Sequence, residues 1–128
     1  MSYYYSKIVR AEFDDAVSRI KQALKDEGFG ILTEIDVRDT LKKKLDVEFR
    51  NYRILGACNP PFAYKALQAE DKIGTMLPCN VVVQETADGG VELAAIDPVA
   101  SMQAIGNPEL QEIAETIGKK LKKIIQNA

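Results

Sequence analysis

The order of hydrophobic and polar residues predicts alternating strands and helices in the first part of the chain. Residues 3–10 are rich in aromatic and β-branched side chains, which is typical of a strand. From Phe13 onward apolar residues recur at steps of four, three and four, so we expect a helix that ends near Gly28. A half-buried strand is predicted over residues 30–37 by side chains at alternate positions, namely Ile31, Thr33, Ile35 and Val37.

The middle of the chain continues this alternation. Leu41 and Leu45 lie four residues apart among lysines, which predicts a short surface helix within residues 38–49. Residues 52–58 are typical of a strand. Two prolines then fit the first turn of a helix over about residues 60–70, because proline cannot join a sheet ladder but suits a helix start.

The last part of the chain carries the clearest signals. Residues 79–85 are too apolar to have one face in water, so we expect a central strand or one covered by a partner. Asp88 and Gly89 then predict a hairpin before a strand over residues 91–96. The final helix begins at Asn107-Pro108, and its apolar stripe consists of Leu110, Ile113, Ile117, Leu121 and Ile124.

The resulting order, β-α-β-α-β-α-β-β-α, predicts the fold class. Short elements and a late hairpin favour an α+β two-layer sandwich with helices packed on a mixed or antiparallel sheet. A doubly wound nucleotide-binding fold is the alternative, but it needs parallel strands and the hairpin argues against them. At 128 residues the chain has the length of a single domain, residues 1–128.

Composition narrows the classes of function. The formal net charge is -2 and hydrophobic residues make up 46%, so we expect a globular protein with no broad attraction for nucleic acid. No segment is apolar over the length that a membrane span needs, which predicts a cytoplasmic protein without membrane contact. With only two cysteines, the reducing cytosol favours free thiols.

Histidine is absent from the sequence, and this is the most informative count. Its absence removes histidine-based acid-base catalysis, catalytic triads and most transition-metal sites. The glycines also form no phosphate-binding loop motif. We therefore expect no metal site, and the sequence assigns no cofactor.

The first candidate residue for chemistry is Cys58, in the stretch LGACNPP. It precedes the predicted helix start at Pro60, where exposed backbone N–H groups can stabilise a thiolate or an anion. The structural alternative is a small buried residue at the end of a strand. Asn59 is expected to cap the helix, since Asp97-Pro98 and Asn107-Pro108 repeat the same arrangement of capping residue and proline.

The second candidate is the stretch LPCNVVV. Cys79 begins a strand and is expected to belong to the core, whereas Asn80 has no helix to cap and must pair with backbone or face a pocket. If the two cysteine-bearing strands are antiparallel, Cys58 and Cys79 lie close together. They could then form a disulfide or hold a soft ligand, provided that their Cα atoms lie within about 7 Å.

Two further groups offer weaker candidates. Carboxylates stand close to the ends of apolar strands at Glu34, Asp36 and Asp97, but their spacing does not bring them together, so solvated strand ends and caps are expected. Tyr3, Tyr4 and Tyr5 could stack on a flat ligand. An edge strand or a dimer contact is the stronger expectation for these tyrosines.

Several segments together resemble a known family. They are Gly28-Phe29-Gly30 with TEIDV, then YRILGACNP, IGTMLPCNVVVQE and AIDPVASM. In this order they are similar to the bacterial and archaeal family called domain of unknown function 302. The resemblance implies a compact α+β domain, a cytoplasmic homodimer and no settled activity. Its marked positions fall on Cys58, Asn59, Pro60, Pro78, Cys79, Asn80, Asp97 and Pro98.

Three hypotheses for function follow. The first is a homodimeric binding module with a pocket for a small ligand, including an anionic or thiol-seeking one, at Cys58, Asn59, Cys79, Asn80 and Asp97. The second is a thiol redox or thiol-transfer enzyme with Cys58 as nucleophile and Cys79 as resolving thiol. The third is a structural or interaction protein that uses the valine-rich strand and the tyrosines for assembly.

Overall fold

The computed structural model describes residues 2–128. Its strands are β1 (Tyr4–Val9), β2 (Gly30–Asp36), β3 (Tyr52–Cys58), β4 (Cys79–Glu85) and β5 (Val91–Ile96). The α-helices are α1 (Phe13–Asp26), α2 (Val37–Leu45), α3 (Pro60–Ala69), α4 (Pro98–Met102) and α5 (Pro108–Asn127). Two 3-10 helices, η1 (Asp71–Met76) and η2 (Gln103–Ile105), complete the chain.

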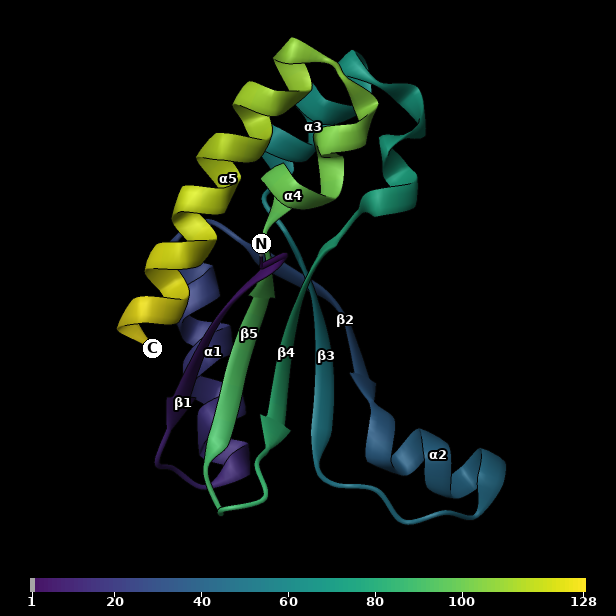
Figure 1. Ribbon diagram of the computed structural model, residues 1–128, viewed down its shortest axis with the longest axis vertical. Helices are drawn as coiled ribbons and strands as arrows, with labels where there is room; N and C mark the ends of the chain where they lie inside the picture. The colour runs from purple at the N-terminus through teal and green to yellow at the C-terminus, as the bar shows by residue number, and fades with distance from the viewer. Residues whose placement is uncertain (1) are drawn as a thin grey trace.

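The five strands form one sheet in the order β1-β5-β4-β3-β2, and each neighbouring pair is antiparallel (Figure 1). This confirms the α+β prediction and the element order. The doubly wound alternative is wrong, since it requires parallel neighbours. The valine-rich strand β4 is central, as its apolar sequence indicates, and the tyrosine-bearing strand β1 lies at an edge.

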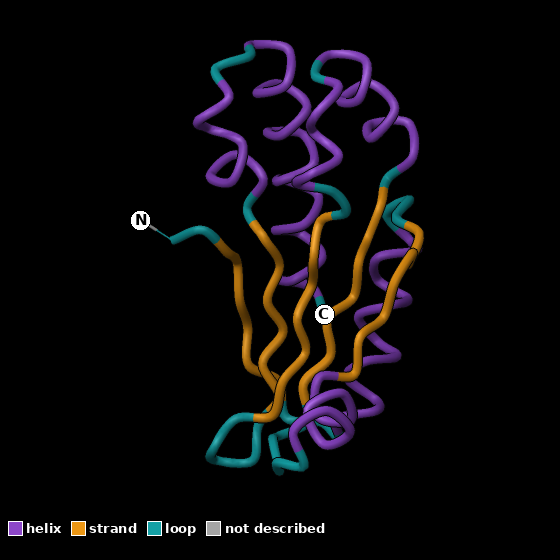
Figure 2. The backbone as a smooth tube through the Cα atoms, turned by 90° about the vertical axis from the view of Figure 1, so that its right-hand side faces the viewer, coloured by secondary structure: helices purple, strands orange, loops and turns teal. Residues whose placement is uncertain are grey.

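Helices α1 and α5 pack on the same face of the sheet and build the main core (Figure 2). Leu55, Val81 and Leu93 point from the three inner strands into this core and are essentially inaccessible to water. The apolar stripe of α5 meets them, with Leu121 fully buried and Ile124 3% exposed. Spacing of apolar residues at three and four positions places such residues on one helix face, which explains why both helices lie flat on the sheet.

The opposite side of the sheet, which we call the open face, has no helix packed across it (Figure 2). Side chains alternate along a strand, so the register assigns every second residue to this face. The open face consists of Tyr4, Ser6, Ile8, Gly30, Thr33, Ile35, Tyr52, Ile54, Gly56, Cys58, Asn80, Val82, Gln84, Glu92, Ala94 and Ile96. Glu92 is the one charged residue among them.

The predicted half-buried pattern of β2 is wrong. A bulge between Ile31 and Thr33 breaks the register with β3 and leaves Leu32 64% exposed. Ile31 pairs with Ala57 and packs against the core, whereas Thr33 pairs with Gly56 on the open face. An extra residue in a strand reverses the direction of the side chains after it, so sequence alternation cannot assign these faces.

The sequence predicts that a capping side chain followed by proline starts three helices, α3, α4 and α5. The capping hydrogen bond is present at α4 and α5 and absent at α3. The Asp97 carboxylate accepts a hydrogen bond from Val99 N at 3.0 Å, and Asn107 Oδ1 accepts one from Glu109 N at 3.1 Å. Asn59 stands at the capping position of α3, but its side chain makes no capping hydrogen bond. The prediction of its position is correct and that of its role is wrong. Within residues 2–128, none of the helices combines the length and apolar character needed to cross a membrane.

Gly56 is fixed by close packing rather than by backbone conformation. A Cβ atom there would collide with Thr33 Oγ1 and come within 2.8 Å of Pro78 Cγ. Gly56→Ala is therefore expected to destabilise the fold by about 1 to 3 kcal/mol, because the Thr33 side chain on β2 and the Pro78 ring just before β4 must move. Urea unfolding monitored by circular dichroism measures the difference.

Gly74 is the matched control, since nothing lies within 4 Å of a Cβ at that position. Gly74→Ala should change the free energy of unfolding by less than about 0.5 kcal/mol. Equal stability of the Gly56→Ala protein and the wild type would contradict the packing described for β2, β3 and Pro78.

Candidate functional site

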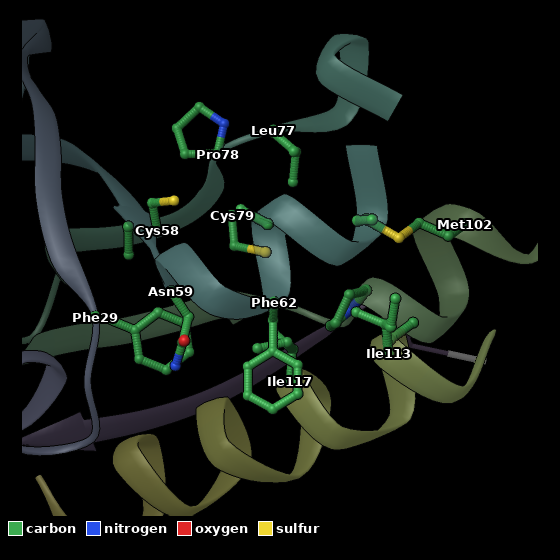
Figure 3. A pocket seen from close by; sticks show the side chains of 15 residues that line it. Phe29, Cys58, Asn59, Phe62, Leu77, Pro78, Cys79, Met102, Ile113 and Ile117 are labelled. Carbon is green, nitrogen blue, oxygen red and sulfur yellow. The ribbon is translucent and has the colours of Figure 1, made fainter. Parts of the chain in front are cut away.

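Three chain segments meet at one end of the sheet, where the inner strands begin or end, and form a cavity. The end of β3, the start of β4 and the end of β5 lie side by side because the strands are antiparallel. From this end the chain continues into α3 and α4, and α5 passes beneath them (Figure 3). A second, smaller core of Ala66, Ile73, Met102, Leu110 and Ala114 holds these helices together.

The cavity has a volume of about 30 Å³ and an almost entirely apolar lining. Both cysteines line it, together with Phe62, Leu77, Met102 and Ile113 from four different elements or loops. A water molecule takes up roughly 30 Å³ in the liquid, so the space admits one or two small groups as it stands. Dry cavities of this kind favour apolar occupants, because no polar partner is available for water.

Cys58 and Cys79 are neighbours across the β3–β4 ladder. Ala57 pairs directly with Cys79, and Cys58 follows one residue later. The predicted proximity is therefore correct, and both thiols are free. Consecutive strand residues point to opposite faces, so the two side chains leave the sheet in different directions. Figure 3 shows Cys79 turned toward the interior of the pocket and Cys58 at its Pro78 side.

The two thiols differ in burial and therefore in reactivity. Cys79 is 9% exposed, and burial together with the nearby Cys58 raises its pKa to about 11. A thiol with such a pKa stays protonated near neutral pH and is a poor nucleophile. Cys58 is only half-buried and lies at the accessible rim.

The start of α3 offers little to an anion. Pro60 and Pro61 occupy the first two helical positions and have no N–H to donate. Ala63 N is already bonded to Asn59 O at 2.9 Å. The Asn59 side chain is directed elsewhere, since its Nδ2 donates to Glu27 O at 3.5 Å and so ties α3 to the end of α1. The anionic-ligand interpretation therefore has weak support in the geometry.

Comparison with known proteins identifies the family. The model of the family described as "Domain of unknown function DUF302" matches residues 5–128. The chain belongs to the DUF302 family. An uncharacterized protein of Aquifex aeolicus is 25% identical over 126 residues, which is 96% of this chain and 81% of that protein.

A solved DUF302 structure supports the same assignment. The crystal structure of an uncharacterized conserved DUF302 protein from Bacillus stearothermophilus superposes with a TM-score of 0.91. The two sequences are 29% identical, and the match covers 98% of each chain. The family resemblance drawn from the Cys-Asn segments is thereby confirmed, together with the fold that it implies.

Two of the predicted site residues of this DUF302 chain lie away from the cavity. Asn80 is exposed on the open face, opposite Gly56, whereas the adjacent Cys79 faces the helices. The Asp97 carboxylate caps α4 and also lies beside Tyr5, whose pKa is raised by burial and by that carboxylate. The structure thus brings Cys58, Asn59 and Cys79 to one cavity and leaves Asn80 and Asp97 outside it.

Reasoning from the sequence missed most of the apolar walls. Phe62, Met102 and Ile113 line the cavity but appear in the sequence as ordinary apolar helix residues. Their helices carry a recognisable signal only in the prolines that start them. Among residues 2–128, no three cysteine or acidic side chains gather into a group that could hold a metal ion.

The raised pKa of Cys79 links stability to pH. Its ordinary value is 9.0 and its value in the folded chain is about 11, so folding favours the neutral thiol. The stabilisation is complete below about pH 9 and decreases as the pH rises toward 11, because only the unfolded chain releases the proton in that interval. The loss should be about 2 to 3 kcal/mol.

Cys79→Ala removes the titrating group and is the control. The difference in unfolding free energy between wild type and Cys79→Ala, measured with urea from pH 8 to pH 11, is expected to shift against the wild type as the pH rises. Parallel pH profiles of the two proteins would show that the Cys79 thiol is not buried.

Proposed function

We propose that this DUF302 protein is a homodimeric binding module whose cavity takes the apolar part of a small ligand. The observation that carries the ligand half of the proposal is the cavity itself. It lies where three strand ends meet two proline-initiated helices, it is lined by apolar side chains, and Cys58 stands at its rim. Small-molecule sites in proteins are mostly concave and apolar with few polar groups, which is the character of this space.

The size and lining of the cavity limit the chemistry of the ligand. About 30 Å³ accommodates a methyl-sized or slightly larger group without movement of the walls. Asn59 is the one amide among the lining residues, and its Nδ2 is already bonded to Glu27 O. An uncharged, apolar group therefore suits the interior better than an anion, and any polar part of the ligand would remain at the rim beside Cys58.

The thiol-enzyme alternative has less support. A resolving thiol must be deprotonated and reach its partner, whereas the pKa of Cys79 is about 11 and its side chain points away from Cys58. Cys58 alone, without a basic partner among the lining residues, has nothing to activate it.

Methionine methyl groups provide a direct test of the ligand half. Met102 is 4% exposed and lines the cavity, whereas Met76 is 40% exposed and does not line it. Xenon is an apolar probe that enters dry, apolar cavities. In protein labelled with ¹³C at the methionine methyls, dissolved xenon is expected to shift the Met102 signal and leave Met76 unchanged.

A matched pair of variants controls this experiment. Ala63 is half-buried in the wall formed by α3, so Ala63→Leu should fill the cavity and abolish the Met102 shift. Ala104 is exposed outside the cavity, so Ala104→Leu should leave the response unchanged. The ligand half of the proposal fails if xenon leaves Met102 unshifted in the wild type, or if Ala63→Leu responds as strongly as the wild type.

A further inference from the structure

The open face of the sheet has the composition of a covered surface. Its apolar residues come from all five strands, and several of them are well exposed in the isolated chain: Ile8 55%, Ile35 46% and Tyr4 41%. Glu92 is the one charged residue on the strands of this face, and Arg50 reaches over it, donating to Gln84 and lying over the Tyr52 ring. A sheet face that stays in water normally carries mostly polar side chains. Large exposed apolar patches mark sites of interaction.

Helix α2 extends on the same side of the molecule. Figures 1 and 2 together show that it projects away from the sheet on the side opposite α1 and α5. None of its residues is buried, and Leu45 at its end is 66% exposed. A nine-residue helix is marginal in water unless an apolar side packs against something. The chain itself offers α2 little to pack against.

The solvent-accessible surface area of the chain is larger than expected for a compact monomer of its mass. The chain exposes 7547 Å² for a mass of 14.2 kDa. A compact monomer of that mass exposes about 6,800 Å², so the excess is roughly 700 to 800 Å². Each partner in a standard protein–protein interface buries about 800 Å². The excess is therefore comparable to the area that one copy loses in an ordinary dimer.

We infer that the open face and α2 form the interface between two copies of this chain. The inference specifies the homodimer half of the proposed function and is independent of the ligand half. A twofold axis uses the same patch on both copies, and we place α2 of each copy against the open face of the other. Leu41 and Leu45 are the leucines of α2, and Lys42, Lys43 and Lys44 are the basic residues of its last turn. The receiving surface is hollowed by about 350 Å³ between Tyr4, Tyr52, Asn80 and Ile96.

This arrangement gives the exposed residues a common role. Leu45 of α2 and Ile35 of β2 become buried against the partner in this arrangement. Most of the lining of the cysteine cavity comes from α3, α4 and α5 on the helix-covered side, whereas Cys58 and Pro78 line it from the side of the open face.

Charged substitutions at exposed positions test the interface without disturbing the core. Ile35→Lys and Leu45→Lys replace side chains that are 46% and 66% exposed in one copy, so each variant should fold with an unchanged circular dichroism spectrum. In sedimentation velocity at micromolar concentrations, the wild type is expected to be a dimer. Both variants are expected to weaken dimerisation by about 100-fold or more, since a buried lysine lacks a partner.

Leu67→Lys is the matched control, because Leu67 is 44% exposed on α3, away from the open face. This variant should remain a dimer. A monomeric wild type, or dimers that persist in Ile35→Lys and Leu45→Lys, or dissociation by Leu67→Lys, would overturn the inference. The xenon response of Met102 in monomeric Ile35→Lys then reports on the ligand half separately.

Discussion

The structure depends on a single constraint: one antiparallel sheet buries one face only. Leu55, Val81 and Leu93 point into the core formed with α1 and α5, and this packing contains most of the fully buried apolar side chains. Both long helices are used on that side. The other face must therefore be covered by something else or remain in water, and its exposed apolar side chains, such as Ile8 and Ile35, favour the first outcome.

The same topology creates the cavity. The antiparallel order brings the end of β3, the start of β4 and the end of β5 together at one end of the sheet. The chain leaves this end through prolines, which start α3 and α4 at fixed positions and provide no N–H groups toward the space between them. Apolar side chains from these helices line the space without filling it completely, and the two thiols mark its boundary with the sheet.

Sequence patterns predicted the element order, the central place of β4 and the meeting of the cysteine-bearing strands. These features follow from local rules such as apolar periodicity, hairpin residues and prolines at helix starts. The sequence did not predict which side of the sheet each residue of β2 faces, because the bulge at Leu32 reverses the alternation of side chains in this strand. The repeated Cys-Asn pair shows the same difficulty: Cys79 and Asn80 point to opposite faces, while Asn59 binds the end of α1 rather than capping α3. Such assignments depend on tertiary contacts.

The most direct test of the division between two faces is the solvent accessibility of isoleucine methyl groups at different protein concentrations. A soluble paramagnetic agent relaxes exposed methyls in NMR spectra. Ile8 and Ile35 on the open face are expected to be protected at high concentration and to become accessible on dilution, while Ile20 and Ile124 in the core stay protected throughout. Equal accessibility of Ile8 and Ile35 at all concentrations would contradict the account, because the open face would then face water in the native protein.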